Sequence, residues 1–418
     1  MIQIFNWVVT GIFLLCYAYQ FFYIAVAAVK KPRRFPEGKL HRFAVMIAAR
    51  NEEAVIGQLL DSINRQTYPQ ELVDVYVMAD NCSDSTAQVA ARGGAVVYER
   101  KNPMQVGKGY ALEALFDRVR ERSAAGLSCY DGYFVFDADN LLDSHYIEEM
   151  NKAFSAGYRV LTSYRNSKNY GANWISAGYA LWFLREARHL NNARMILGSS
   201  CAISGTGFLM AREVVEKNGG WKHFLLTEDI EFTVDQVCHG EKIGYCHDAM
   251  LYDEQPETFR ASWTQRLRWA KGYYQVFYHY GAGLLKGIFK RHSFSCYDMS
   301  MTIMPALILS LLTILVNGGA MAVSLIQGSG QPVDILLSAA GLLAQVYLTF
   351  FGIGLCACLS EWKKILCSTG KKIFYLFTFP LFMLTYIPIS ICALFRHIDW
   401  KPVRHTVAVS IDQMQVGK

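Results

Sequence analysis

In the stretch "YFVFDADN", residues 133–140, an apolar, aromatic run is followed by two carboxylates, Asp137 and Asp139. The run has the composition of a buried strand. Two like charges side by side at the end of a buried strand are costly unless a cation neutralises them. The stretch therefore predicts a strand whose end binds a cation, and the identity of that cation is the first question about function.

Similar apolar strands precede this one, and helix-like segments separate them. The pattern predicts strands over 43–49, 73–80, 95–98 and 133–137, with helices over 53–66, near 84–92, over 108–121 and from Ser144. Apolar strands that alternate with helices predict an α/β domain with a mainly parallel sheet covered on both faces. Ligands of such sheets bind beyond the carboxyl ends of the strands.

Polar residues follow three of the predicted strands. They are Arg50-Asn51-Glu52, Asp80-Asn81, and the pair Asp137 and Asp139. Each group alone is compatible with a turn or a helix cap. Because the carboxyl ends of parallel strands meet at one edge of a sheet, the three groups together predict a ligand site.

The Asp-x-Asp pair is suited to a hard cation. Mg²⁺ or Mn²⁺ prefers carboxylate oxygens together with the phosphates of a substrate. An alternative is a phosphatase of the haloacid-dehalogenase type, because "VFDADNLL" resembles the nucleophile strand of those enzymes. In those phosphatases the motif opens the domain, whereas here it follows three strand–helix units. The stretch "NPMQVGKGY" (102–110) is a poor match to a P-loop, because the leading glycine is missing and Gly109 replaces the Ser or Thr.

Two later stretches add candidate site residues. "LLTEDIEF" (225–232) places Glu228 and Asp229 after Thr227, which has the chemistry of a helix N-cap. "TQRLRWAKG" (264–272) reads as a helix, and its Gln, Arg and Trp at i, i+3 and i+4 share one face. Such a face is either an amphipathic surface with a packed Trp or a site that binds phosphate, sugar hydroxyls and a sugar ring.

The composition indicates membrane-spanning segments. Hydrophobic residues make up 52% of the 418 residues and charged residues 18%. A span takes ~20 helical residues, and uncharged stretches of that length occur at 7–29, 302–326, 335–360 and 373–395. The net charge of +6 forms no basic stripe, which argues against a nucleic-acid partner, and the 11 cysteines show no zinc-site spacing.

Basic residues next to the first span predict the orientation. The run "KKPRR" (30–34) marks the cytoplasmic flank, so residues 35–298 are expected in the cytoplasm. The side of the tail stays open. Four crossings place it outside, whereas Arg396, Lys401 and Arg404 favour the inside, and prolines at 380 and 388 are compatible with a broken, re-entrant last segment.

Five motifs in order resemble those of family 2 membrane glycosyltransferases, which include cellulose, hyaluronan and poly-N-acetylglucosamine synthases. The motifs are "ARNEE" (49–53), Asp80, "DAD" (137–139), "TED" (227–229) and "QRLRW" (265–269). The resemblance covers about residues 40–280. It implies a glycosyltransferase-A fold, Rossmann-like with a mainly parallel sheet, inserted between transmembrane helices. It also implies an inverting transfer from a nucleotide sugar, usually UDP-linked, with Mg²⁺ or Mn²⁺.

The resemblance implies a role for each matching residue. Nucleotide-sugar contacts are implied for Arg50, Glu52, Asp80, Lys108, Asp137, Asp139, Gln265 and Arg268. Metal binding is implied for Asp137 and Asp139, and catalysis for Asp229 as general base with Glu228 beside it. Acceptor contacts are implied for Trp269 and for Gly205 and Thr206 of "SGTGF" (204–208).

The expected organisation follows from these motifs and spans. The chain divides into an N-terminal helix and basic flank (1–34), the catalytic domain (35–258), the Q-x-x-R-W helix with an interface segment (259–298), C-terminal membrane helices (299–397) and a tail (398–418). We expect a multi-pass protein of a bacterial plasma membrane.

Three functions remain to be separated. The leading prediction is a processive enzyme that extends an extracellular β-linked polysaccharide. Four spans are few for a wide pore, so a homo-oligomer or a secretion partner would complete it. The alternative enzyme adds a sugar to a lipid carrier or glycolipid. A non-catalytic membrane scaffold would not need the complete set of carboxylates that this sequence has.

Overall fold

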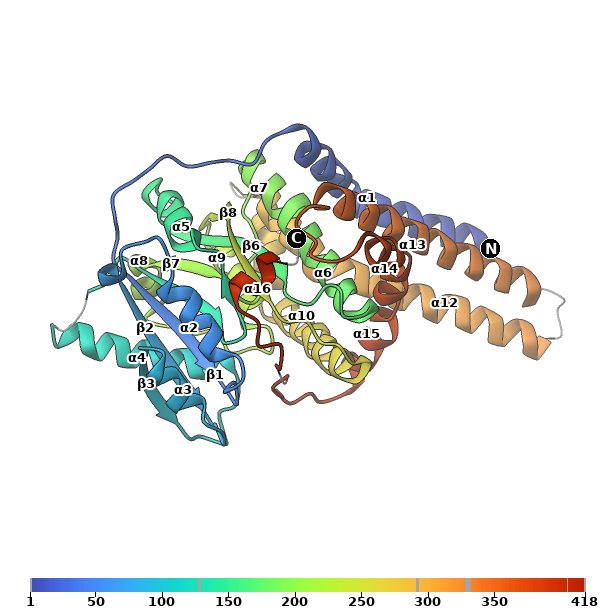
Figure 1. Cartoon of the computed structure of the whole chain (residues 1–418). Coiled ribbons are helices and arrows are strands. Elements are labelled where there is room, and N and C mark those ends of the chain that lie inside the picture. Colours follow the sequence, from blue (N-terminus) through green and yellow to red (C-terminus); the bar gives the residue numbers. More distant parts are fainter. Residues whose placement is uncertain (1, 127–128, 291–292, 328–331, 404, 417–418) are drawn as a thin grey trace.

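A mixed sheet of eight strands forms the centre of the α/β domain, in the order β3-β2-β1-β4-β7-β6-β8-β5 (Figure 1). The computed structural model describes residues 2–126, 129–290, 293–327, 332–403 and 405–416. The strands are β1 (Phe43–Ala49), β2 (Val73–Asp80), β3 (Val96–Arg100), β4 (Gly132–Asp137), β5 (Leu141–Leu142), β6 (Val160–Ser167), β7 (Phe208–Ala211) and β8 (Ile243–Asp253).

The direction of the strands brings the predicted site residues to one edge. β3, β2, β1 and β4 pair in parallel, as predicted from the alternation of strands and helices. β7 is antiparallel to both β4 and β6, and β5 is antiparallel to β8, so the second half of the sheet is mixed. Because β1, β2 and β4 end on the same side, the polar residues that follow them meet there.

Successive residues of a strand point to opposite faces of the sheet. In this sheet both sets of side chains are apolar, so helices cover both faces. Ala44 and Met46 of β1 belong to one apolar core, and Phe43, Val45 and Ile47 to the other. The helices of the α/β domain and the segment that follows it are α2 (Ile56–Asn64), α3 (Thr86–Arg92), α4 (Lys108–Ala124), α5 (Tyr146–Ser155), α6 (Trp174–Arg185), α7 (Asn192–Leu197), α8 (Arg212–Asn218), α9 (Glu228–Cys238), α10 (Phe259–Ile288) and α11 (Ser293–Ile303), with a short 3-10 turn η1 (Gln70–Leu72) and a π-helical segment η2 (Glu186–Asn191).

Four helical segments are long and apolar enough to cross a membrane, and they correspond to the four predicted stretches. They are α1 (Ile2–Val29), α12 (Pro305–Gln327), α13 (Pro332–Ser360), and α14 (Thr369–Leu384) followed by α15 (Tyr386–Phe395). α1, α12 and α13 extend together away from the sheet (Figure 1). The fourth segment packs on these helices and on the domain: α14 contacts α13 and α6, and α15 contacts α10 and α12.

The fourth segment is interrupted between its two prolines. α14 contains Pro380 and ends at Leu384, and α15 begins at Tyr386. Pro388 has no N–H to donate to the carbonyl of Leu384, four residues earlier. Arg266 of α10 donates 3.1 Å to the Phe382 carbonyl and 2.6 Å to Thr385 Oγ1 at this break. The predicted interruption is therefore present, and an arginine binds the backbone that it exposes.

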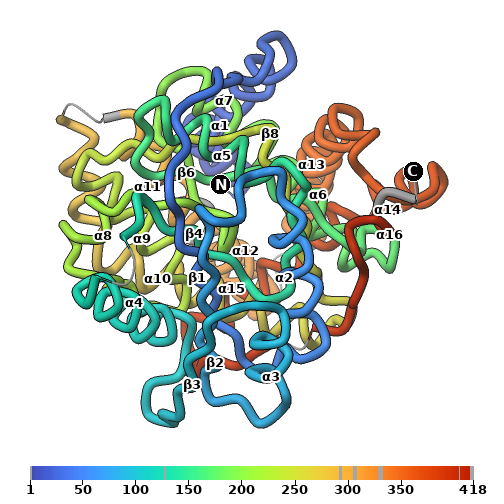
Figure 2. Tube along the Cα trace, turned by 60° about the vertical axis from the view of Figure 1, so that its left-hand side comes forward, coloured from blue at the N-terminus to red at the C-terminus, as the bar shows by residue number. Residues whose placement is uncertain are grey.

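The tail returns to the α/β domain. His405 Nδ1 lies 3.0 Å from the Glu52 carboxylate, and the N–H groups of Thr406 and Val407 donate to Glu254. Figures 1 and 2 both show α16 (Ile411–Val416) beside α2. The expectation from four crossings, that the tail lies on the opposite side from the catalytic domain, is therefore wrong, because a segment bound to the sheet edge cannot also lie across a membrane. Arg404, used in the opposite argument, is outside the described residues.

A buried ion pair ties α1 to the α/β domain. Arg194 of α7 and Asp298 of α11 form a bidentate pair with distances of 2.7 and 2.8 Å, and both side chains are almost fully buried. Tyr19 and Tyr23 of α1 donate to the two carboxylate oxygens of Asp298 at 2.9 and 2.8 Å. These bonds fix both the height and the rotation of α1 against the domain.

Candidate functional site

A cavity of about 690 Å³ starts at the carboxyl edge of the sheet and continues between the long helices. At the sheet it is lined by the residues that follow β1, β2 and β4, by α9, by α10 and by the tail. Beyond Asp229 it is lined by residues of α1, α6, α10, α11, α12, α13, α14 and α15, and we call this part the helical chamber. Representative residues of the helical chamber are Thr10, Tyr17, Trp182, Thr302, Gln345 and Phe350.

Lys108 is the cation next to the first carboxylate of the Asp-x-Asp pair. Its Nζ contacts the Asp137 carboxylate, donates 2.7 Å to the Gly205 carbonyl, and lies 3.8 Å from Glu228. Burial alone would lower the pKa of Lys108, but Asp137 and Glu228 raise it above its usual value. Gly109 permits this approach of α4, because a Cβ there would be 2.3 Å from the His223 carbonyl oxygen.

Asp139 is buried among cationic side chains. It is 4% exposed, and it accepts a 2.8 Å hydrogen bond from the N–H of Glu254. Burial alone would raise the pKa of Asp139, but His405, Lys168 and the Glu254 N–H lower it below its usual value. The carboxylate is therefore held in its ionised form, which is the form that binds a metal ion.

The residues predicted to contact the nucleotide all lie at this edge. Arg50 lines the cavity and stacks 5.6 Å from the ring centre of Trp400 in the tail. Glu52 pairs with His405, and Asp80 pairs with Arg100 at 2.7 Å. The tail thus covers the residues after β1, a contribution that the sequence analysis did not predict.

Several buried polar atoms of the cavity have no hydrogen-bond partner among the described residues. They are the donors Nε and Nη1 of Arg50 and Nε of Arg268, and the acceptor Oε1 of Gln265; Nζ of Lys168, outside the cavity lining, is a further buried donor without a partner among these residues. A buried cationic donor without a partner is costly, and a diphosphate supplies many acceptor oxygens. The unpaired donors are therefore suited to an anionic ligand at the sheet edge.

The two acids of the T-E-D motif start α9 on the other side of Lys108. Asp229 Oδ2 accepts a 2.7 Å hydrogen bond from the N–H of Gly205, whose φ of +80° favours glycine. Burial raises the pKa of Asp229, against the opposing effects of Lys108 and the backbone N–H groups. Burial likewise raises the pKa of Glu228 to about 7, and Asp229 adds to the rise. A raised pKa makes an ionised carboxylate a stronger base.

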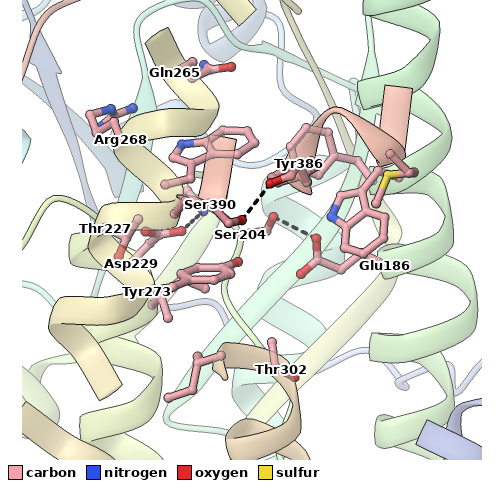
Figure 3. Close-up of a pocket in the computed structure, with 18 of the residues that line it drawn as sticks. Glu186, Ser204, Thr227, Asp229, Gln265, Arg268, Tyr273, Thr302, Tyr386 and Ser390 are labelled. Carbon is pink, nitrogen blue, oxygen red and sulfur yellow. Dashed lines mark hydrogen bonds between the residues drawn. The ribbon is translucent and has the colours of Figure 1, made fainter. Parts of the chain in front are cut away.

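The predicted face of α10 is present. Gln265, Arg268 and Trp269 all line the cavity, and Figure 3 shows Gln265 and Arg268 on α10, with Arg268 on the side of Thr227 and Asp229. Trp269 also packs edge-on against Tyr179, with ring centres 5.6 Å apart. The two readings of this helix are compatible, because the Trp is both packed and exposed to the cavity.

Two residues have roles that differ from those expected. Thr206 is 2% exposed and does not line the cavity; its hydroxyl donates to Asn140 and accepts from the Asp137 N–H at 2.9 Å. An acceptor contact by Thr206 therefore does not fit this structure, and the residue positions the Asp-x-Asp turn instead. Thr227 is at the N-cap of α9, but its side chain makes no capping hydrogen bond.

Asp137 and Asp139 fit a divalent cation that is completed by its substrate. No group of three or more His, Cys, Asp or Glu side chains in the described ranges could hold a metal by itself. Mg²⁺ commonly takes one or two protein carboxylates and fills its other positions with phosphate oxygens and water. Two carboxylates beside unpaired cationic donors are the set that such a metal–diphosphate complex requires.

Some residues of the cavity gave too little signal in the sequence. Glu186 and Arg165 line it together with Lys401 and Trp400 of the tail. A charged Arg-Glu pair in the otherwise apolar run "ISAGYALWFLREA" was the available signal for Glu186. The tail residues come from a segment with no strand or helix pattern.

Comparison with known proteins is consistent with this geometry. A family model described as "Glycosyltransferase like family 2" matches residues 41–272. The chain is 27% identical over 248 residues to the probable glycosyltransferase YdaM of Bacillus subtilis, which covers 56% of each chain. It is 26% identical over 242 residues to the beta-monoglucosyldiacylglycerol synthase of Synechocystis, covering 56% of this chain and 48% of that one.

A third relative is the poly-beta-1,6-N-acetyl-D-glucosamine synthase of Staphylococcus epidermidis, 24% identical over 238 residues, covering 55% of this chain and 54% of that one. The chain thus spans about half the length of the curated relatives it matches. Among solved structures, the mannosyltransferase PcManGT from Pyrobaculum calidifontis, in complex with GDP-Man and Mn²⁺, superposes with a TM-score of 0.57 at 15% identity over 94% of this chain and 99% of that one. The predicted fold class is confirmed.

Proposed function

The chain belongs to glycosyltransferase family 2 and is a glycosyltransferase, and from that premise we propose that it transfers a sugar from a nucleotide sugar to a hydroxyl group of a membrane lipid. The observation that supports this proposal is the course of the cavity. It joins the carboxylates of the sheet edge to the helical chamber between α1, α12 and α13. One cavity thus gives a water-soluble donor and a lipid acceptor access to the same carboxylates.

The donor occupies the sheet-edge part of the cavity. Arg50, Glu52 and Asp80 contact the nucleotide, and Arg268 and Gln265 contact the diphosphate, as the resemblance implies. Lys168 adds a buried, unpaired ammonium group near Asp139. PcManGT, with its bound GDP-Man and Mn²⁺, supports a nucleotide-sugar donor and a divalent metal for this fold.

A divalent cation, Mg²⁺ or Mn²⁺, would be held by Asp137 and Asp139 and would neutralise charge on the diphosphate leaving group. The chain itself contributes positive charge at the same place. Lys108 contacts Asp137, and Arg268 lies near Glu228. Positive charge in a partly buried site favours departure of the diphosphate.

The acceptor hydroxyl attacks the anomeric carbon, and the bond from that carbon to the diphosphate oxygen breaks. The attack comes from the face opposite the diphosphate, so the configuration at the anomeric carbon is inverted, and the hydroxyl proton passes to the carboxylate of Asp229. The Gly205 N–H holds Asp229 in place. The diphosphate takes the electron pair of the broken bond, so charge and atoms balance.

A lipid acceptor accounts for the helices better than a secreted polymer does. α1, α12 and α13 extend away from the sheet, and α14 and α15 join these helices to α6 and α10. A bundle of this size is small for a polysaccharide channel within one chain. Among the relatives, the beta-monoglucosyldiacylglycerol synthase supports the lipid alternative and the polymer synthase the other.

A panel of donors tests this function. Purified protein in lipid nanodiscs is incubated with UDP-glucose, UDP-N-acetylglucosamine or GDP-mannose, and nucleotide release is measured with and without lipid acceptor. We expect one donor to give lipid-dependent release and a product the size of a glycolipid. A product of polymer size on a gel would replace the lipid proposal with the polysaccharide alternative.

The proposed orientation can be tested with cysteine labelling. Cys129 is an exposed native thiol of the α/β domain and can report on which side of the membrane the domain lies. In intact cells an impermeant thiol reagent should leave Cys129 unmodified, and it should label Gln327→Cys at the far end of α12. The reverse pattern would overturn the orientation, and opened vesicles should show labelling of both.

Trp269 is expected to act on the acceptor. An aromatic contact with a sugar ring contributes on the order of 1 kcal/mol, which corresponds to about fivefold. Trp269→Ala should lower lipid-dependent transfer by about that factor while donor hydrolysis and UDP competition change little. Trp263→Ala is the matched control, because Trp263 is on the same helix and packs against α15 rather than the cavity. Equal effects of both variants would indicate a packing role only.

A further inference from the structure

A second carboxylate faces the same space as Asp229. Glu186 is the first residue of the π-helical segment η2 that follows α6, and it lines the cavity. π-Helical segments within helices are often found at functional sites. Figure 3 shows Glu186 and Asp229 on opposite sides of Ser204, with Tyr273 nearby.

One loop holds both carboxylates. The hydroxyl of Ser204 donates 3.1 Å to Glu186 Oε2, and the N–H of the next residue, Gly205, donates 2.7 Å to Asp229 Oδ2. Tyr273 lines the same cavity, and its pKa is raised by burial and further by Glu186 and Asp229. Their spacing is thus set by two adjacent residues of the chain.

Glu186 has no salt bridge within the part of the chain that the structure describes. The nearby cations are engaged elsewhere: Arg165 with Asp253, Arg194 with Asp298, and Arg185 with Gln20 and the ring of Trp182. Burial raises the pKa of Glu186. Thr227, which is 4% exposed, also lines the cavity, and its hydroxyl has no hydrogen-bond partner among the described residues.

A carboxylate accepts hydrogen bonds and donates none, so the group that it binds is a donor. Two carboxylates at one place repel a phosphate and favour hydroxyl groups. We propose that Glu186 is a specificity-determining residue that binds a second hydroxyl of the acceptor head group, next to the hydroxyl that reacts at Asp229. The preferred acceptor is then a lipid with a polyol head group, such as a sugar.

This inference rests on the proposed transfer to a lipid and adds a selection among lipids. The helical chamber binds the apolar chains, and Asp229 takes the proton of the reacting hydroxyl. Glu186 accepts a hydrogen bond from the second hydroxyl of the head group. A lipid with a single hydroxyl makes the first two contacts and not the third. A lipid phosphate meets two like charges.

Three lipids with the same acyl chains test the selection: didecanoylglycerol, its glucoside, and didecanoyl phosphatidic acid. With the donor selected by the panel, the parental protein should prefer the glucoside to didecanoylglycerol by about tenfold or more in kcat/KM. Phosphatidic acid should not be glycosylated. Glu186→Ala should lower kcat/KM for the glucoside by about the same factor, mainly through KM, and should change the value for didecanoylglycerol less than twofold.

Two further variants guard against a purely structural effect. Glu186→Gln keeps the shape and a weaker acceptor oxygen, and should retain part of the preference; it also replaces the alanine variant if that one does not fold. Glu213→Gln, an exposed carboxylate of α8, should match the parental protein. UDP affinity and donor hydrolysis without acceptor should be unchanged in all of them.

The outcomes separate the two proposals. Retention of the glucoside preference in Glu186→Ala, or no preference in the parental protein, would overturn the role of Glu186 and leave lipid transfer in place. Release of nucleotide with no transfer to any of the three lipids, together with a polymeric product, would overturn the proposed function and the role of Glu186 with it.

Discussion

Asp229→Asn is expected to slow sugar transfer by at least about 100-fold, the typical effect of a lost general base, while nucleotide-sugar binding stays near the parental level. The change preserves shape and removes basicity. Asn Oδ1 can still accept the hydrogen bond from the Gly205 N–H, so the loop and the start of α9 should keep their positions. Single-turnover transfer and UDP titration measure the two effects separately.

The control for this variant is Asp235→Asn on the same helix. Asp235 bonds His223 at 3.1 Å and does not line the cavity, so its loss should affect stability and not the transfer step. If the Asp229 variant transfers at the parental rate, the base is another group. Glu228, whose pKa is raised to about 7 by burial, would be the next residue to replace.

Asp139→Asn is expected to reduce metal-dependent transfer by at least about 100-fold, because a metal clamp contributes several kcal/mol of charge stabilisation. Alanine is less suitable at this position, because it would also destabilise the fold. Asp139 is 4% exposed and is surrounded by His405, Lys168 and Arg165, so alanine would leave buried cations without compensation. Asparagine also removes the charge, but it keeps the shape of the side chain and the acceptor for the Glu254 N–H, so it disturbs the fold less than alanine.

Calorimetric titration of Mn²⁺ and UDP, with activity as a function of Mn²⁺ concentration, measures the loss. Asp143→Asn is the matched control, since it also follows the β4 turn and does not line the cavity. If the Asp139 variant kept the parental activity in EDTA, the Asp139 carboxylate would not bind a metal ion that transfer requires.

The sheet edge could be predicted because its signals are local. Each strand is a short apolar run, and the polar residue that follows it is the next one in the sequence, so Arg50, Asp80 and Asp137 could be placed without knowing any distant contact. The parallel direction of β1, β2 and β4 then brings them together. The same reasoning placed Asp229 at a helix start and Trp269 on a helical face.

The rest of the cavity depends on contacts between distant residues. His405 meets Glu52 across 353 residues, and no periodicity in the tail indicates where it binds. Glu186 lies in an apolar helix that pattern alone assigns to the core, and its role depends on a hydrogen bond from Ser204. Burial likewise decided the pKa of Asp229, because the helix-start effect could be read from the sequence and the desolvation could not.

The bonds from α1 to Asp298 have a consequence for biosynthesis. Tyr23 and Asp298 are 275 residues apart, a distance that a ribosome takes roughly 15–55 s to translate at about 5–20 residues per second. All the strands of the sheet are made in that interval, since β8 ends at Asp253. The core of the enzyme can therefore fold while α1 is still undocked in the nascent chain. The docking of α1, and with it the closing of the cavity that α1 lines, belongs to the late steps of assembly.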